Sequence, residues 1–204
     1  SGRRRDPGEF RTLMKDSIRQ RLERSLERTE EVGRLLADPA TAGVWNLVPA
    51  RSSVRFRNKT LWGLVPVNGE FTDVSGDGQI TAKGAVFGRV DVRAASVETG
   101  IKKRDEHLCS PDFFDADAHP EISVVVTDVT PTGEGTADLR TELTVRGNTR
   151  PVPLSATIEH AGDGTVRIST QTTVDRTAFG VSGNMAGMMP TTTTLIADLV
   201  FAKG

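Results

Sequence analysis

The sequence has little cysteine, no tyrosine and no long apolar run, and each shortage excludes a class of protein. Cys109 is the only cysteine, so a disulfide within the chain is impossible and a thiolate metal cluster is disfavoured. No segment approaches the roughly 18 consecutive apolar residues that a membrane-spanning helix requires. A formal net charge of -1 gives no whole-chain field toward nucleic acid or anionic lipid. The fold must therefore rest on an apolar core.

The length of 204 residues fits one domain with a modest extension. We interpret residues 1–10 as vector-derived, residues 11–42 as an N-terminal helical extension and residues 43–204 as the folded domain. The N-terminus lacks the apolar core of a signal peptide, so we expect a cytoplasmic protein. A secreted or periplasmic location is the alternative if a signal peptide has been removed.

Residues from about 13 to 37 have the pattern of an amphipathic helix. Ile18, Leu22 and Leu26 recur at four-residue steps, and Asp38 and Pro39 end the pattern. Three further apolar residues continue near the same face: Val32, Leu35 and Leu36. The charges between them have both signs, which disfavours a lipid surface. We expect the helix to pack on its own domain or on a second copy in a homodimer, and recruitment of another partner is the alternative.

From Val44 onward the apolar period changes to two, which is typical of strands with one face on a core and one in water. The clearest runs cover residues 86–94, 139–145, 152–158, 166–174 and 195–201. Gly147 and Asn148 predict a tight hairpin, and residues 73–77 and 161–164 are further turn clusters. About eight strands joined by short turns predict a mainly β protein, a barrel or a sandwich, and a barrel leaves no exposed edges.

The inward face of the predicted barrel carries many small or β-branched side chains, which favours a ligand cavity over a filled interior. Candidate lining residues are these small side chains, the aromatic residues and the methionines of a glycine-rich loop. The candidates are Phe56, Trp62, Phe71, Phe87, Phe114, Ala156, Phe179, Met185, Met188, Met189 and Ala197.

One charged stretch, residues 96–120, interrupts the strand pattern. Residues 102–108 predict a short helix, and Pro111 opens a turn that ends at Phe113 and Phe114. This stretch resembles the signature of the YceI-like, polyisoprenoid-binding proteins, whose fold is an extended lipocalin-like barrel. Other motifs agree with that family in order and spacing: the segments 44–47, 52–56, 67–71, 143–152 and 176–181. The resemblance covers roughly residues 44–203.

The resemblance implies an antiparallel lipocalin-like β-barrel that binds a long isoprenoid or similar amphiphilic lipid, such as a prenyl quinone, in its interior. Arg104, His107 and Arg176 are the head-group candidates. We expect carriage or storage of the lipid without catalysis, no cofactor besides the lipid, and no nucleic-acid partner. An enzyme acting on a lipid or quinone in the same pocket is the rival hypothesis.

Two constellations have chemical potential but are incomplete. Asp115, Asp117 and His119 could ligate a metal, yet no second cluster completes a shell, so we expect none. His107, next to Asp105 and Glu106, could act as a general base, with Cys109 as a nucleophile. Residues two apart on a helix point to different sides, so a Cys–His pair is disfavoured.

Overall fold

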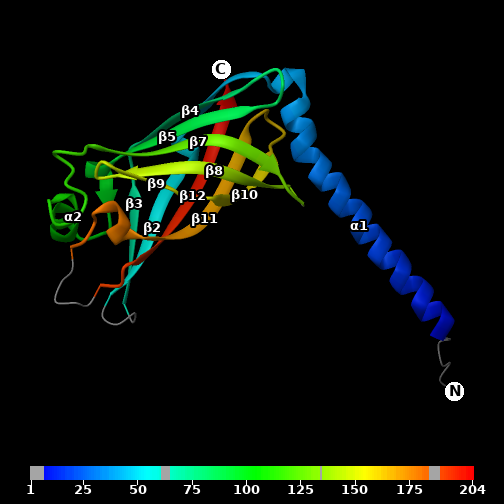
Figure 1. Ribbon diagram of the computed structural model, residues 1–204, viewed down its shortest axis with the longest axis horizontal. Helices are drawn as coiled ribbons and strands as arrows, with labels where there is room; N and C mark the ends of the chain where they lie inside the picture. The colour runs from blue at the N-terminus through cyan, green and yellow to red at the C-terminus, as the bar shows by residue number, and fades with distance from the viewer. Residues whose placement is uncertain (1–6, 61–64, 134, 184–188) are drawn as a thin grey trace.

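The computed structural model describes residues 7–60, 65–133, 135–183 and 189–204 as a long N-terminal helix attached to one end of a β-barrel (Figure 1). The helices are α1 (Pro7–Ala37) and α2 (Lys102–Cys109), and the 3-10 turns are η1 (Pro39–Thr41), η2 (Pro49–Arg51), η3 (Ala94–Ser96) and η4 (Arg176–Phe179). The strands are β1 (Gly43–Leu47), β2 (Ser53–Thr60), β3 (Val65–Phe71), β4 (Val74–Ile80), β5 (Val86–Arg93), β6 (Val97–Glu98), β7 (Glu121–Pro131), β8 (Thr136–Val145), β9 (Asn148–Pro151), β10 (Leu154–His160), β11 (Val166–Asp175) and β12 (Thr192–Lys203).

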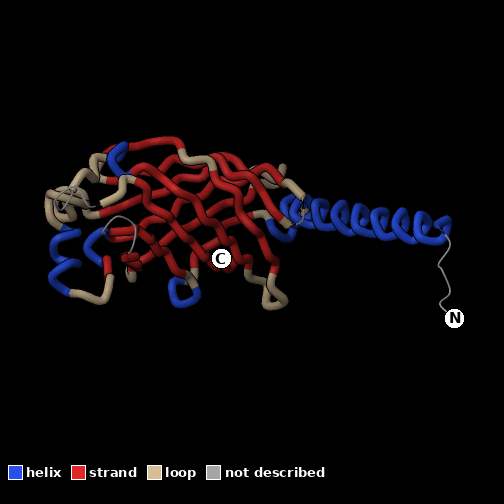
Figure 2. The backbone as a smooth tube through the Cα atoms, turned by 90° about the horizontal axis from the view of Figure 1, so that it is seen from below, coloured by secondary structure: helices blue, strands red, loops and turns tan. Residues whose placement is uncertain are grey.

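The barrel closes through eight antiparallel strands, which confirms the predicted fold class. Their order is β1, β4, β5, β7, β8, β10, β11 and β12, and β1 pairs with β12 to complete the ring. Three strands are interrupted: β1 continues as β2, β3 as β4, and β5 as β6. The partners persist across each break, since β2 pairs with β12 and β3, and β3 pairs with β6. The crossing strands are visible in Figure 2.

Local backbone chemistry explains the hairpins. Arg146 and Gly147 both have positive φ, 51° and 72°, and Val145 pairs with Asn148 across them. Two such residues form the tight turn that suits the twist of a hairpin. The predicted hairpin is therefore confirmed, with its turn at Arg146 and Gly147, one residue earlier than predicted, because β9 begins at Asn148. Gly164, with φ 82°, lies in the predicted turn between β10 and β11, which is also confirmed.

The turn predicted over residues 73–77 is wrong beyond Asp73, because β4 begins at Val74. Gly76, which contributed to that prediction, has another purpose. A Cβ there would lie 2.7 Å from the carbonyl oxygen of Arg89 on β5. Glycine therefore permits close approach of two strands at this position.

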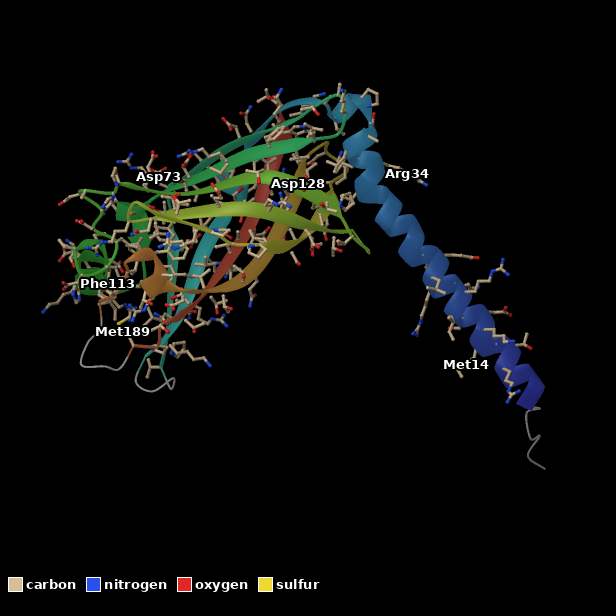
Figure 3. All side chains as sticks on the ribbon, viewed as in Figure 1. Met14, Arg34, Asp73, Phe113, Asp128 and Met189 are labelled. Carbon is tan, nitrogen blue, oxygen red and sulfur yellow. The ribbon has the colours of Figure 1, made fainter. Side chains whose placement is uncertain are left out.

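Helix α1 begins at Pro7, earlier than the predicted start near residue 13, and it has two parts with different surroundings. Near its C-terminal end Val32 is 2% exposed, and α1 contacts β7 and β8. Further out, Leu13, Met14, Ile18 and Leu22 are exposed, and Figure 3 shows Met14 far from the barrel. Among the side chains that the structure describes, those of residues 11–24 are exposed, and packing of α1 on its own domain holds at Val32. No helix among the described residues combines the length and apolarity needed to cross a membrane.

The junction between α1 and the barrel is fixed by Thr41 and Trp45. The Thr41 hydroxyl lies 2.5 Å from the carbonyl oxygen of Leu35 in α1 and 2.8 Å from that of Asp38, and it can donate to either. The Trp45 indole N–H donates to the carbonyl oxygen of Thr41 at 2.8 Å. Both residues are buried. A buried indole N–H needs such a partner, so these bonds hold the end of α1 against the first strand.

Candidate ligand-binding cavity

The barrel encloses a cavity of about 580 Å³ that extends from the end of α1 to the α2 end. Leu35 and Leu36 of α1 line it together with Trp45. At the other end it is lined by Leu108 of α2 and by Phe113 and Phe114, which follow α2. Between these ends the wall consists mainly of inward aliphatic side chains from β5, β7, β8, β11 and β12. A volume and lining of this kind are typical of small-molecule sites.

Three phenylalanines pack against one another toward the α2 end. The ring centroids of Phe56 and Phe71 lie 5.7 Å apart, those of Phe71 and Phe114 also 5.7 Å, and those of Phe56 and Phe114 6.3 Å. The ring of Phe114 meets the rings of Phe56 and Phe71 edge to face. Aromatic quadrupoles favour this arrangement. The triad joins β2, β3 and the segment after α2, and all three residues line the cavity.

The three head-group candidates also lie in the wall. Arg104, His107 and Arg176 come from α2 and η4, which Figure 1 shows at the same end of the barrel. The structure thus places the three head-group candidates, two of them arginines, at one end of an apolar cavity.

Arg176 is the most buried of the three, at 7% exposure, and its guanidinium holds the segment before β12. Its Nε donates to the carbonyl oxygen of Pro190 at 3.0 Å, and its Nη1 donates to those of Val181 and Gly183 at 2.7 and 2.9 Å. Its Nη2 makes a longer bond of 3.4 Å to Met189. Burial lowers the pKa of Arg176. Four of its five guanidinium N–H groups thus donate to backbone carbonyl groups of the described residues.

Arg104 and His107 of α2 form hydrogen bonds with the segments that directly precede and follow this helix. Arg104 donates to Thr99 through Nε and Nη2, both at 2.7 Å, and the side chain of Asp105 accepts from the Thr99 backbone N–H at 2.9 Å. His107 Nε2 lies 2.9 Å from an Asp112 carboxylate oxygen, so its acidic neighbour differs from those in the acid–base hypothesis. The His107 side chain is 41% exposed.

The predicted lining residues fall into four groups. Phe56, Phe71, Phe114, Phe179, Met189 and Ala197 line the cavity. Phe87 is also in the wall but is 52% exposed, so much of its ring faces solvent. Ala156 points inward but packs tightly with Ala137 and Leu139, outside the lining set. Trp62, Met185 and Met188 lie outside the described residues.

Sequence reasoning missed two parts of the wall. Asn58 lies on the inward face of β2, and its place in the alternation of Val54, Phe56 and Asn58 could have revealed it. The sequence places Leu35 and Leu36 in the apolar stripe of the predicted helix. No local signal shows that they would meet the barrel, because that contact joins segments far apart in the sequence.

Cys109 and the candidate metal ligands Asp115, Asp117 and His119 do not form a catalytic or metal site among the described residues. Cys109 lies with its Sγ 3.9 Å from the carbonyl oxygen of Ala94, and burial raises the pKa of its thiol, which lowers the thiolate fraction. Within the described ranges, no three His, Cys, Asp or Glu side chains gather closely enough to hold a metal ion.

The match to known proteins agrees with this geometry. The model of the YceI-like domain matches residues 45–201. The chain belongs to the YceI-like family. Among its relatives, a UPF0312 protein of Pseudomonas syringae pv. tomato is 33% identical over 142 residues, covering 66% of this chain and 72% of the relative. A UPF0312 protein of Pseudomonas putida strain GB-1 is 38% identical over 99 residues, covering 46% of this chain and 52% of the relative.

Solved structures of other bacterial proteins have the same fold. Burkholderia cenocepacia BcnA superposes with a TM-score of 0.69 at 23% identity, covering 76% of this chain and 98% of BcnA. A polyisoprenoid binding domain from Saccharophagus degradans superposes with a TM-score of 0.67 at 16% identity, covering 78% of this chain and 98% of that domain. Helix α1 precedes the residues that match the YceI-like domain.

Proposed function

We propose that this YceI-like barrel binds a long-chain isoprenoid or a similar amphiphilic lipid in its interior, and that it carries or stores the lipid without altering it. The observation that carries the proposal is the cavity of about 580 Å³, apolar along its length and cationic at the α2 end. Such a cavity matches a molecule with a long hydrocarbon chain and one polar end. The name of the Saccharophagus degradans neighbour, a polyisoprenoid binding domain, supports the same ligand class.

The energetics of burial favour a long chain. Each buried methylene contributes about 0.8 kcal/mol, so a chain of about 20 carbons gains roughly 16 kcal/mol. Association costs at least about 4 kcal/mol in lost translational and rotational freedom, and ordering of the chain adds to that. Micromolar affinity needs about 8 kcal/mol, which remains available after these costs. A short chain would fail this balance.

The side chains at the cationic end support binding better than catalysis. His107 is paired with Asp112 near the surface, and the thiol of Cys109 has a raised pKa. Arg176 uses most of its donors on backbone carbonyl groups. The rival function, an enzyme acting on a lipid or quinone in the same cavity, predicts a product of altered mass.

Native mass spectrometry after incubation with geranylgeraniol tests the proposal. Ala197→Phe places a ring in the cavity wall, and Gln171→Phe places the same ring at an exposed position of the neighbouring strand. We expect the wild type and Gln171→Phe to hold one unaltered prenol, and Ala197→Phe to hold much less. Equal loading of all three, or no loading of the wild type, would refute interior binding. A prenol of altered mass after extraction would favour the enzyme.

A further inference from the structure

Two threonine hydroxyl groups lie in the apolar wall of the cavity, on neighbouring strands. Thr172 lies on the inward face of β11 and Thr193 on that of β12, and both residues line the cavity. Thr172 pairs with Leu195 and Thr193 pairs with Val174, so the two threonines are diagonal neighbours across one strand pair. Diagonal neighbours lie roughly 7–8 Å apart, which leaves room for one small polar group of a ligand between the two side chains.

The fold does not use these two hydroxyl groups. Those of Thr141 and Thr170, which are also inward, donate to backbone carbonyl oxygens. Neither Thr172 nor Thr193 makes a side-chain hydrogen bond with any residue that the structure describes. A hydroxyl group without a partner in apolar surroundings is costly, and native proteins pair most such groups. The two threonines therefore need a partner that comes from outside the fold.

A molecule in the cavity can reach both hydroxyl groups. Among the side chains that the structure describes, the polar atom that is fully enclosed and without a partner is Oδ1 of Asn58. The unpaired hydroxyl oxygens of Thr172 and Thr193 are not enclosed in this way, so each keeps accessible surface. Because both side chains are inward, and Thr193 is only 9% exposed, this surface faces the cavity.

The pair lies deeper in the barrel than the head-group candidates. Thr172 precedes Arg176 by roughly 13 Å along the chain, at about 3.3 Å per strand residue. Leu195 is the partner of Thr172 on β12, and Phe56 is the partner of Leu195 on β2, so the surroundings of Thr172 are apolar. A lipid with its polar end near Arg176 would therefore present its chain, and not its polar end, to the two threonines.

We propose that Thr172 and Thr193 bind an oxygen atom that the ligand carries part-way along its chain, such as a hydroxyl or keto group. The inference rests on the lipid-binding function proposed above and specifies the ligand class as lipids with an oxygenated chain. Each threonine hydroxyl can donate a hydrogen bond to such an oxygen. A plain hydrocarbon chain leaves both threonines unpaired, whereas an oxygenated chain regains there the hydrogen bonds that it loses with water.

The test compares ricinoleyl alcohol with oleyl alcohol by isothermal titration calorimetry on the full chain. The two probes share their chain length and terminal hydroxyl, and ricinoleyl alcohol has one further hydroxyl in the middle of its chain. We expect the wild type to bind ricinoleyl alcohol at least as tightly as oleyl alcohol. The double variant Thr172→Val and Thr193→Val keeps the shape of both side chains but removes their hydroxyl groups. It should bind ricinoleyl alcohol roughly tenfold more weakly, which corresponds to about 1.4 kcal/mol, and oleyl alcohol as the wild type does.

Thr173→Val is the matched control, because it makes the same change at an exposed position of β11 and should retain the wild-type affinities. The urea midpoint of the double variant should not fall, and a fall would show that the fold uses the two hydroxyl groups and would overturn the inference. The inference is also overturned, with lipid binding intact, if the wild type prefers oleyl alcohol tenfold or if the double variant does not weaken ricinoleyl alcohol selectively. Failure of the wild type to bind either alcohol would remove the proposed function together with the inference.

Discussion

Gly69 on β3 lies directly against the ring of Phe56 on β2. A Cβ at Gly69 would fall 2.3 Å from Cε1 and Cζ of that ring, far inside contact distance. The absence of a side chain at Gly69 therefore lets Phe56 lie on the backbone of the neighbouring strand and reach Phe71 and Phe114. The packing of the three phenylalanines thus requires glycine at position 69, because the Cβ of any other residue would collide with the Phe56 ring.

Gly69→Ala should force the Phe56 ring to move and disturb the aromatic triad. Overpacking of a tight core costs typically about 1–3 kcal/mol, so we expect a loss of this size in the free energy of unfolding, measured in urea. Gly162→Ala is the control, because nothing lies within 4 Å of a Cβ there. Equal stability of the two variants would show that Phe56 has room to rotate.

Arg176→Lys keeps a positive charge but removes the planar fork that reaches four carbonyl groups. We expect a loss of roughly 2–4 kcal/mol in unfolding free energy, since hydrogen bonds to a charged group contribute about 1.5–3 kcal/mol each and lysine can replace only some of them. Arg57→Lys, on the exposed face of β2, is the matched control. An unchanged urea midpoint in Arg176→Lys would argue that Arg176 serves the ligand rather than the fold.

Asp163, in the turn between β10 and β11, gives a pH dependence of known sign. Hydrogen bonds from the Thr165 hydroxyl and backbone N–H, with the Arg51 guanidinium at 3.0 Å, lower the pKa of Asp163 to about 2. Its unfolded value is about 3.9. A lowered folded pKa stabilises the protein above about pH 4, and this contribution is lost as the pH falls through about 2. The melting temperature of Asp163→Asn should therefore be lower than that of the wild type at pH 7 and converge with it near pH 2. A difference that persists unchanged at pH 2 would contradict the assignment.

The exposed stripe of α1 should associate with a second copy of the chain. Leu13, Ile18 and Leu22 are 54–62% exposed, and the mixed charge around them disfavours lipid. Sedimentation velocity should show a dimer whose fraction rises with concentration, and replacing these three residues with glutamine should yield a monomer. The melting temperature of the barrel should not change, because the three side chains project away from it. A wild type that remains monomeric at high concentration would show that α1 stands alone.

The barrel could be predicted because its strands alternate. The runs through Val90, Leu143 and Leu199 each place one face on the interior, and the structure confirms β5, β8 and β12 at nearly the predicted positions. Turn chemistry was equally informative at Gly147 and Gly164. It was misleading at Gly76, because the sequence alone does not distinguish a glycine that permits close contact between strands from a glycine that forms a turn.

The candidate site was predicted less completely, since its contacts join distant segments. The bonds of Arg176 go to backbone carbonyl groups, which every residue has, so no sequence pattern announces them. The side-chain oxygen of Asn58 is buried without a hydrogen-bond partner. The sequence does not show this, because it depends on which groups β3 and β12 place beside β2, and therefore on the register of the strands. The interruptions between β1 and β2 at η2 and between β5 and β6 at η3 could not be predicted either, because they are recognised only from the neighbouring strands with which both halves pair.

The contact of α1 with the cavity has a consequence for chain-length selection. Leu35 and Leu36 line the end of the cavity opposite α2, and they belong to a helix that precedes the matched YceI-like domain. A lipid anchored at the α2 end would meet these two leucines with its tail, so they would act as the stop of a molecular ruler. Shorter side chains there would lengthen the ruler while every strand of the barrel kept its sequence. Under the proposed function, the length of the lipid and its polar end would then be recognised by separate parts of the chain, and each could evolve without the other.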